Sequence, residues 1–222
     1  KIKVTLLVKS IQDVVADQLP RQIVIAYLPE IPCIKKIVIY LLHGALASIL
    51  HLILSRKDNV QPGKAVQKIQ MINAHCSPVH TTHYDIAFGV DQYWPIYYTA
   101  LRINADKKYA WIHPQYSSLN ANAKTDEHIF RQLNMIFAVS SKNASMLAEI
   151  FPAISQKINY IESITDNDTV LNLAQQECPS GYSNTIYNII SVCRLDNSSK
   201  RIDRMVRCAA ILAAHRCDYL WR

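Results

Sequence analysis

The chain has 222 residues, of which 50% are hydrophobic and 18% are charged, so it can bury a core and does not have the composition of a disordered segment. Its 24 Lys and Arg exceed its 17 Asp and Glu, and the net charge of +7 suits an anionic partner such as phosphate, nucleic acid or an acidic membrane face. With only 4 glycines, a glycine-rich phosphate loop within this chain is nearly excluded.

Strand-like and helical segments alternate along the chain. The strand-like runs are short, apolar and rich in β-branched residues, and they cover 2–8, 22–28, 84–90, 109–112, 135–139, 157–161 and 185–192. Segments 141–151 and 199–216 carry apolar residues near the 3.6-residue spacing of a helix. Because this alternation is typical of βαβ units, we predict an α/β fold with a Rossmann-like, mostly parallel sheet and flanking helices.

The run Ile37–Leu54 is almost wholly apolar, and cations lie on both sides of it, at Lys35, Lys36, Arg56 and Lys57. Its length just reaches the lower limit for a membrane span. Three interpretations remain open: a buried or half-buried helix, a helix lying in the interface of an anionic membrane, and a true span. The flanking cations fit the interfacial helix, because they would face anionic lipid.

Metal and nucleic-acid sites are weakly supported. The six cysteines form no CxxC pair, and we interpret them as free thiols in a reducing compartment. His75, Cys76, His80 and His83 are four potential zinc ligands, but no second ligand pair is evident, so we expect a polar loop at 75–83 and no metal. The basic residues interleave with core positions and form no recognised module, so we expect no nucleic-acid partner.

The segment Ile189–Asp203 has the strongest chemical signal. It reads as an apolar strand, a short polar turn with Arg194, and a helix with Lys200 in its first turn. Helix N-termini favour anions, arginine offers a planar fork for phosphate oxygens, and lysine adds a point charge. The arrangement suits a diphosphate. The alternative is a surface loop with two solvated cations.

The same residues resemble the start of the second domain in glycosyltransferase family 4, the retaining sugar transferases with the GT-B fold. The family pattern is a strand, then V-G-R-L, a short spacer, Lys, and a helix with I/F-D-R-L. This chain has Cys193 in place of the Gly. Four upstream segments are similar to family motifs in the same order, with Ser163 where Asn is usual, and they lie at 84–89, 107–116, 135–141 and 151–166.

The resemblance implies a function and a set of site residues. Arg194 and Lys200 would bind the diphosphate of a nucleotide-sugar donor, and His113 would be the catalytic-site residue that hydrogen-bonds the transferred sugar or donor. Tyr116 would help to line the acceptor side. The implied enzyme moves a hexose from a nucleotide-diphosphate sugar to a lipid-linked or cell-surface glycan, with retention of configuration and without a metal or other cofactor.

The resemblance also implies a domain organisation. We expect most of an acceptor-side domain over 1–178 and the first strand and helix of the donor-binding domain over 185–222, with a linker near 175–184. The chain would then be part of a longer, cytoplasmic protein, peripheral on the inner face of a membrane. Cys193 and Ser163 favour the alternative, a non-catalytic Rossmann-like module that binds a membrane or protein partner.

Overall fold

The structure is a computed structural model, and it describes residues 2–8, 19–28, 32–45, 47–50, 63–176, 186–197, 200–215 and 217–221. The chain divides into two compact units, which we call unit 1 (Lys1–Ser163) and unit 2 (Ile164–Arg222). The predicted linker at 175–184 lies mostly outside the described residues.

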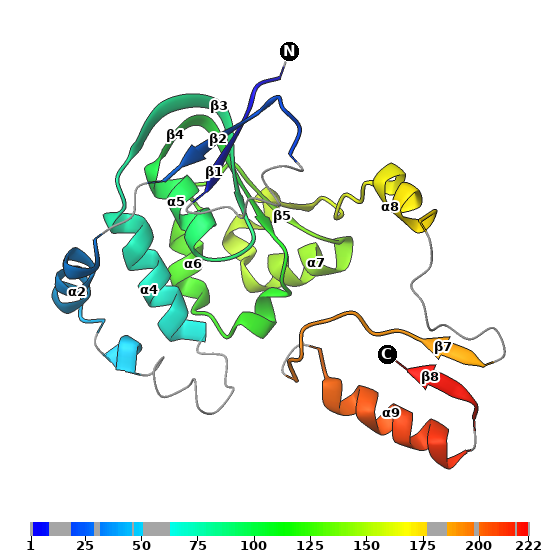
Figure 1. The fold of residues 1–222 in the computed structure, drawn as a ribbon. Coiled ribbons are helices and arrows are strands. Elements are labelled where there is room, and N and C mark those ends of the chain that lie inside the picture. The colour runs from blue at the N-terminus through cyan, green and yellow to red at the C-terminus, as the bar shows by residue number, and fades with distance from the viewer. Residues whose placement is uncertain are drawn as a thin grey trace. The chain divides into compact units, whose positions relative to one another are not determined.

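Every described strand pair is parallel. The strands are β1 (Val4–Val8), β2 (Ile23–Tyr27), β3 (His80–Val90), β4 (Ile103–Ile112), β5 (Met135–Ala138), β6 (Ile158–Tyr160), β7 (Tyr187–Ile189) and β8 (Tyr219–Trp221). β3, β4, β5 and β6 form one sheet in that order, while β1 pairs with β2 and β7 pairs with β8. Together with the helices between them (Figure 1), these strands confirm the predicted α/β, Rossmann-like fold.

The described helices connect these strands (Figure 1). They are α2 (Cys33–Leu42), α4 (Gly63–Cys76), α5 (Trp94–Arg102), α6 (Ala123–Phe130), α7 (Ser141–Ile150), α8 (Asn167–Ala174) and α9 (Ile202–Ala214), with 3-10 turns η1 (Tyr116–Leu119) and η2 (Pro152–Lys157). The predicted helix at 141–151 is α7, whose N-cap Ser140 accepts a hydrogen bond from the amide of Asn143.

The core of unit 1 lies on one face of the four-stranded sheet. Ala110 in β4 and Ile136 in β5 face it and are fully buried. Helices α5, α6 and α7 add their apolar side chains to the same cluster, among them Tyr97, Phe130 and Leu147. Because successive side chains of a strand point to opposite faces, the buried residues of β5 and of the end of β4 alternate with half-buried ones.

The opposite face of the sheet carries an aromatic cluster. Phe88 in β3 lies 5.1 Å from Tyr109 in β4 and 6.2 Å from Phe137 in β5, between ring centroids. Phe88 is nonetheless 47% exposed, and its neighbours Ile86 and Val90 on the same strand are also exposed. The two faces of this sheet are therefore packed to different degrees.

The apolar run Ile37–Leu54 is not one continuous helix. α2 ends at Leu42, and Gly44 adopts a φ of 60°, a left-handed conformation that glycine reaches without strain. A new helical turn covers 47–50, and the rest of the run lies outside the described residues. In the part of the chain that the structure describes, no helix has the length and hydrophobicity needed to cross a membrane.

Unit 2 contains α8 and a β7–α9–β8 unit. None of its described residues is buried. The predicted helix at 199–216 is α9, but the expectation that Lys200 lies in its first turn is wrong. The helix begins at Ile202, because Arg201 before it adopts a left-handed φ of 52° that a right-handed helix does not contain. The side-chain oxygen of Asn197 accepts a hydrogen bond from the Asp203 amide in the first turn (3.0 Å).

Candidate functional site

The loops after β3, β4 and β5 lie at the same edge of the sheet of unit 1, because these strands are parallel and adjacent. Ligands of open α/β sheets bind at this carboxyl edge. The loop after β4 contains both site residues that the sequence predicts for unit 1, His113 and Tyr116. This edge is therefore the candidate site.

The loop between β3 and α5 is strained. Asp91 and Tyr93 have φ angles of 85° and 58°, which non-glycine residues rarely adopt. Gly89 explains how the loop can be so tight, because a Cβ at this position would lie 2.7 Å from the Ile96 Cα of α5. Backbone strain of this kind concentrates at functional sites, where it fixes side-chain geometry.

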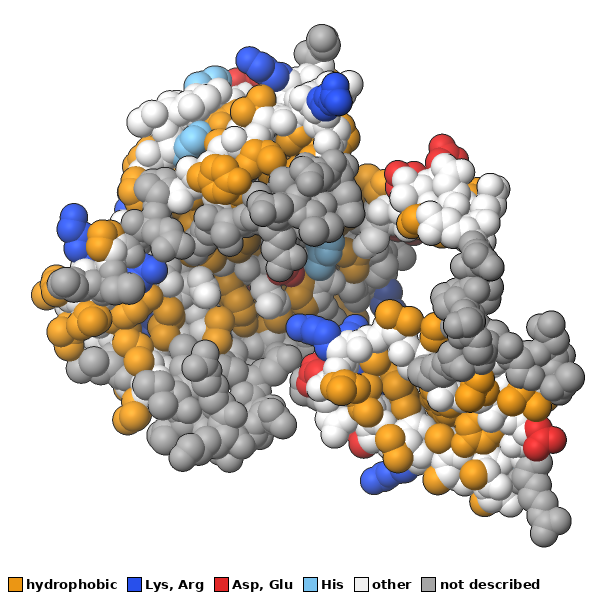
Figure 2. All heavy atoms as spheres, viewed as in Figure 1, with side chains coloured by type: hydrophobic (Ala, Val, Ile, Leu, Met, Phe, Trp, Pro, Cys, Tyr) orange, Lys and Arg blue, Asp and Glu red, His pale blue; other side chains and the backbone are white. Residues whose placement is uncertain are grey.

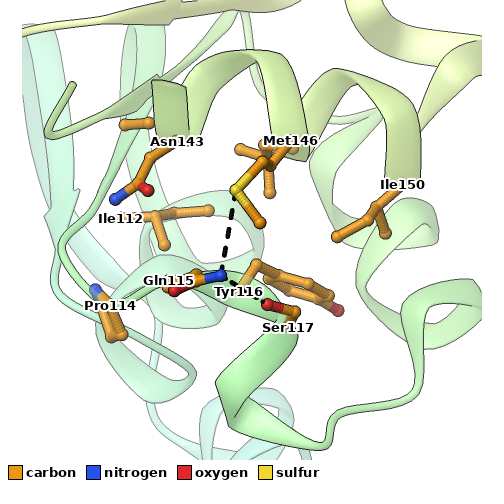
Figure 3. A pocket seen from close by; sticks show the side chains of 10 residues that line it. Ile112, Pro114, Gln115, Tyr116, Ser117, Asn143, Met146 and Ile150 are labelled. Carbon is orange, nitrogen blue, oxygen red and sulfur yellow. Dashed lines mark hydrogen bonds between the residues drawn. The ribbon is translucent and has the colours of Figure 1, made fainter. Parts of the chain in front are cut away.

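A pocket lies between the loop after β4 and helix α7 (Figure 3). It has about 260 Å³ of empty volume, part of it open to solvent. The lining residues are Ile112, Pro114, Gln115, Tyr116, Ser117, Ala138, Asn143, Met146, Leu147 and Ile150. None of them carries a charge, so the pocket offers amide and hydroxyl groups over an apolar floor.

The polar groups of this pocket are partly held in place. The Gln115 Nε2 donates a hydrogen bond to the Ser117 Oγ (3.0 Å) and lies 3.8 Å from the Met146 sulfur, as the dashed lines in Figure 3 show. Asn143 extends from the first turn of α7 on the side of Ile112 (Figure 3). These amides can both donate to and accept from the hydroxyls of a neutral ligand.

A second pocket adjoins the first, and the two share Ile112 and Tyr116. It has about 230 Å³ of empty volume beneath the loop after β3. Gln92 lines it, and within the described part of the chain no donor hydrogen-bonds to the buried Oε1 of this residue. Buried polar atoms are usually satisfied, so this oxygen is available to a ligand or a water.

Asp126 lies at the bottom of the second pocket. The Tyr116 hydroxyl donates to its Oδ2 (2.5 Å), and the Tyr97 hydroxyl donates to its Oδ1. Burial raises the pKa of Asp126, although these two hydrogen bonds act in the opposite direction. Burial and the nearby Asp126 also raise the pKa of Tyr93, to about 12. The tyrosines are therefore neutral donors at physiological pH.

His113 and Tyr116 take different positions at this edge. His113 is exposed, with its ring 4.7 Å from that of Trp111 in an edge-on arrangement, and it flanks the first pocket without lining it. The ring of Tyr116 lines both pockets, while its hydroxyl is engaged by Asp126. The ring, and not the hydroxyl, is therefore the part of Tyr116 that faces a ligand.

Arg194 and Lys200 belong to unit 2, on the segment between β7 and α9, and both are exposed. In the described ranges of unit 2, neither side chain has a hydrogen bond or an ion pair. The neighbouring Arg201 differs, because it forms an ion pair with Asp203 (2.8 Å) and lowers the pKa of that carboxyl to about 2. Arg194 and Lys200 are thus available to an anion.

The potential zinc ligands at 75–83 are dispersed over two elements. His75 and Cys76 end α4, whereas His80 and His83 lie in β3, which begins earlier than the sequence indicated, so the expected loop over 75–83 is wrong. His83 instead hydrogen-bonds Asp106 (3.0 Å). Among the described residues, no group of three or more His, Cys, Asp or Glu could hold a metal ion. The cysteines whose side chains the structure describes, Cys76, Cys193, Cys208 and Cys217, are free thiols.

Sequence reasoning missed Asp126, Gln92 and Asn143. A signal for Asp126 exists, because it lies three and four residues before the buried Ile129 and Phe130, on the apolar face of α6. A charged residue at such a position requires buried partners. Gln92 and Asn143 lie in a turn and in the exposed start of a helix, where polar residues are ordinary.

No protein-family model matches the chain, and no curated protein matches it. Chemically, the described residues offer uncharged amide and hydroxyl groups at the pocket of unit 1 and two exposed cations, Arg194 and Lys200, in unit 2.

Proposed function

We propose that the chain is part of a retaining glycosyltransferase that moves a hexose from a nucleotide-diphosphate sugar to a lipid-linked or cell-surface glycan. The observation that carries the proposal is the exposed pair Arg194 and Lys200 on the segment between β7 and α9. The planar guanidinium of Arg194 would donate two hydrogen bonds to phosphate oxygens of the donor, and the ammonium of Lys200 would add a positive charge beside them.

Sugar transfer needs this positive charge when the donor breaks down. The bond between the anomeric carbon and the diphosphate breaks, the acceptor hydroxyl oxygen bonds to that carbon, and the hydroxyl proton leaves with the diphosphate. Negative charge on the diphosphate grows during this step, and preorganised cations stabilise it. The uncharged pocket that Gln115 and Asn143 line in unit 1 suits the hydroxyls of a sugar, and His113 would hydrogen-bond the transferred sugar or donor.

The test is titration of the full chain with UDP and with GDP. Arg194→Ala should weaken binding of the preferred nucleotide about tenfold or more, because a hydrogen bond to a charged group is lost. Arg207→Ala is the matched control, since it removes the same charge from the exposed side of α9 and should change affinity little. In the intact enzyme, Arg194→Ala should also lower turnover strongly. Equal effects of the two substitutions would contradict the assigned role.

Cys193 favours a second candidate function, a non-catalytic Rossmann-like module. This residue is half-buried beside Arg194, where the resembling family has glycine, and its side chain would crowd a phosphate. The module interpretation predicts that the chain binds neither UDP nor GDP. It also predicts that Cys193→Gly creates no such binding.

A further inference from the structure

Helix α2 turns an apolar face outwards. Ile37, Val38, Leu41 and Leu42 form this surface, which we call the α2 face, and they are 60%, 49%, 50% and 79% exposed. At 100° per residue the four side chains span an arc of about 140°, wider than the stripe of about 100° by which a surface helix usually packs on a core. Figure 2 shows hydrophobic side chains gathered over α2, at the left of the view. An apolar stripe on a helix normally faces the core, and this one does not.

The orientation of α2 is fixed from its other side. The Tyr40 hydroxyl donates a hydrogen bond to the Asn73 Oδ1 of α4 (2.7 Å). Lys68 of α4 donates from its Nζ to the carbonyl of Gly44 (2.7 Å), just beyond the end of α2. Ile39 and Tyr40 are the half-buried residues of this contact. Because α2 is held by these bonds, the α2 face cannot rotate inwards without breaking them.

Positive charge borders the α2 face. Lys35 is exposed and lies about 20° beyond Leu42 around the helix, at the rim of the apolar arc. Lys68 lies at the opposite end, beside Gly44. From residue 32 to residue 76 the sequence has six Lys or Arg and a single acidic residue, Asp58. The described surface therefore combines exposed aliphatic side chains with a lysine at each end, Lys35 and Lys68.

We propose that the α2 face docks on the surface of a bilayer that contains anionic lipids. The helix would lie parallel to the surface, with its four aliphatic side chains at the boundary between headgroups and acyl chains. The lysines would extend to the headgroups. A helix of 10 residues is about 15 Å long and is suited to lie in this layer, not to cross it. The inference does not depend on sugar transfer.

Sedimentation with lipid vesicles tests the proposal on the full chain. Vesicles of phosphatidylcholine with 30% phosphatidylglycerol should bind the chain, whereas pure phosphatidylcholine vesicles should bind it more weakly. Lys35→Gln should weaken binding to the anionic vesicles about fivefold, and 0.5 M salt should remove this difference. The double variant Ile37→Gln/Leu41→Gln keeps helix propensity and should weaken binding to both vesicles about tenfold or more.

The matched control is Val206→Gln/Ile211→Gln, which removes two exposed aliphatic side chains from α9 in unit 2. It should leave vesicle binding unchanged. The proposal is overturned if the wild-type chain ignores anionic vesicles, if both double variants weaken binding equally, or if sedimentation velocity without lipid shows a dimer that only Ile37→Gln/Leu41→Gln dissociates. The last result would assign the α2 face to a second copy of the chain. Because no donor nucleotide is present, these results are independent of those with UDP and GDP.

Discussion

Units 1 and 2 have the same parallel strand–helix–strand pattern, yet among the described residues only those of unit 1 form a buried core. In unit 1 the helix α7 buries Leu147, and the strand β5 buries Ile136 completely. In unit 2 the helix α9 is also amphipathic, but Val206 and Ile211 are 64% and 58% exposed. None of the described residues of unit 2 is buried.

The difference shows that secondary-structure pattern and packing are separate properties. Four paired strands in unit 1 offer a surface wide enough for three helices, whereas β7 and β8 offer two short strands to one helix. A two-stranded unit has marginal stability in water, because it buries too little apolar surface to offset the entropy of ordering its chain. The pocket of unit 1 is therefore built on packed elements, whereas we expect the exposed cations of unit 2 to gain order only if an anion binds.

A pair of matched substitutions gives the largest expected contrast between the units. Leu147→Ala in α7 should lower the free energy of unfolding by about 3 kcal/mol, because it leaves a cavity in a packed core. Ile211→Ala in α9 removes an aliphatic side chain of the same size from an exposed position. It should therefore change the free energy of unfolding by less than about 0.5 kcal/mol. Urea unfolding followed by tryptophan fluorescence and circular dichroism measures both.

The circular-dichroism signal matters in this comparison, since it reports on the helices of both units. A loss from Ile211→Ala as large as that from Leu147→Ala would mean that α9 is packed as tightly as α7. That result would contradict the contrast between the units.

A smaller effect concerns the buried carboxyl of unit 1. Burial raises the pKa of Asp126 in the folded state above its ordinary value of 3.8. Between 3.8 and the raised value the folded state holds a proton that the unfolded state has released, so stability falls as pH rises through this window, by up to about 1.4 kcal/mol per pH unit. Below pH 3.8 both states are protonated and this contribution is fully present.

The variant Asp126→Asn cannot titrate and should lack this component. The measurement is the free energy of unfolding of the wild type and the variant at a series of pH values from 3 upwards. The free energy of unfolding of the wild type minus that of the variant should decrease as the pH rises above 3.8 and then level off. A difference that is independent of pH would show that Asp126 titrates alike in both states.

The strands β1, β2 and β5 match their predicted runs to within a residue or two, because these runs are almost continuously apolar. The run predicted at 185–192 is β7, which covers only Tyr187–Ile189. β3 and β4 begin earlier than predicted, at His80 and Ile103, because most of their first residues are polar and exposed and give no apolar signal in the sequence. Ile103 is the exception, since it is buried in the core.

Helix α5 could not be predicted from periodicity. Its residues Ile96 to Ala100 are buried in succession, so the sequence shows no alternation between an apolar and a polar face. A helix covered on all sides looks like a short apolar strand in a sequence. The end of α2 at Leu42 could not be predicted either, because apolar residues continue on both sides of Gly44.

The candidate site could be predicted in its location but not in its composition. His113 follows a predicted strand, and parallel strands bring such residues to one edge, so its place at the carboxyl edge of the sheet followed from the pattern. The bond between Tyr116 and Asp126 joins residues of two different elements, and nothing in their spacing indicates it. The diphosphate roles of Arg194 and Lys200 stay predictions.

Hydrogen exchange of the full chain with and without nucleoside diphosphate tests the central proposal most directly. Without ligand, the amides of β5 should be strongly protected and those of α9 weakly protected, as their burial indicates. Saturating UDP or GDP should slow exchange at residues 193–204, around Arg194 and Lys200, and leave β5 unchanged. Exchange at 193–204 that neither nucleotide alters would contradict the assignment of these cations to a donor diphosphate.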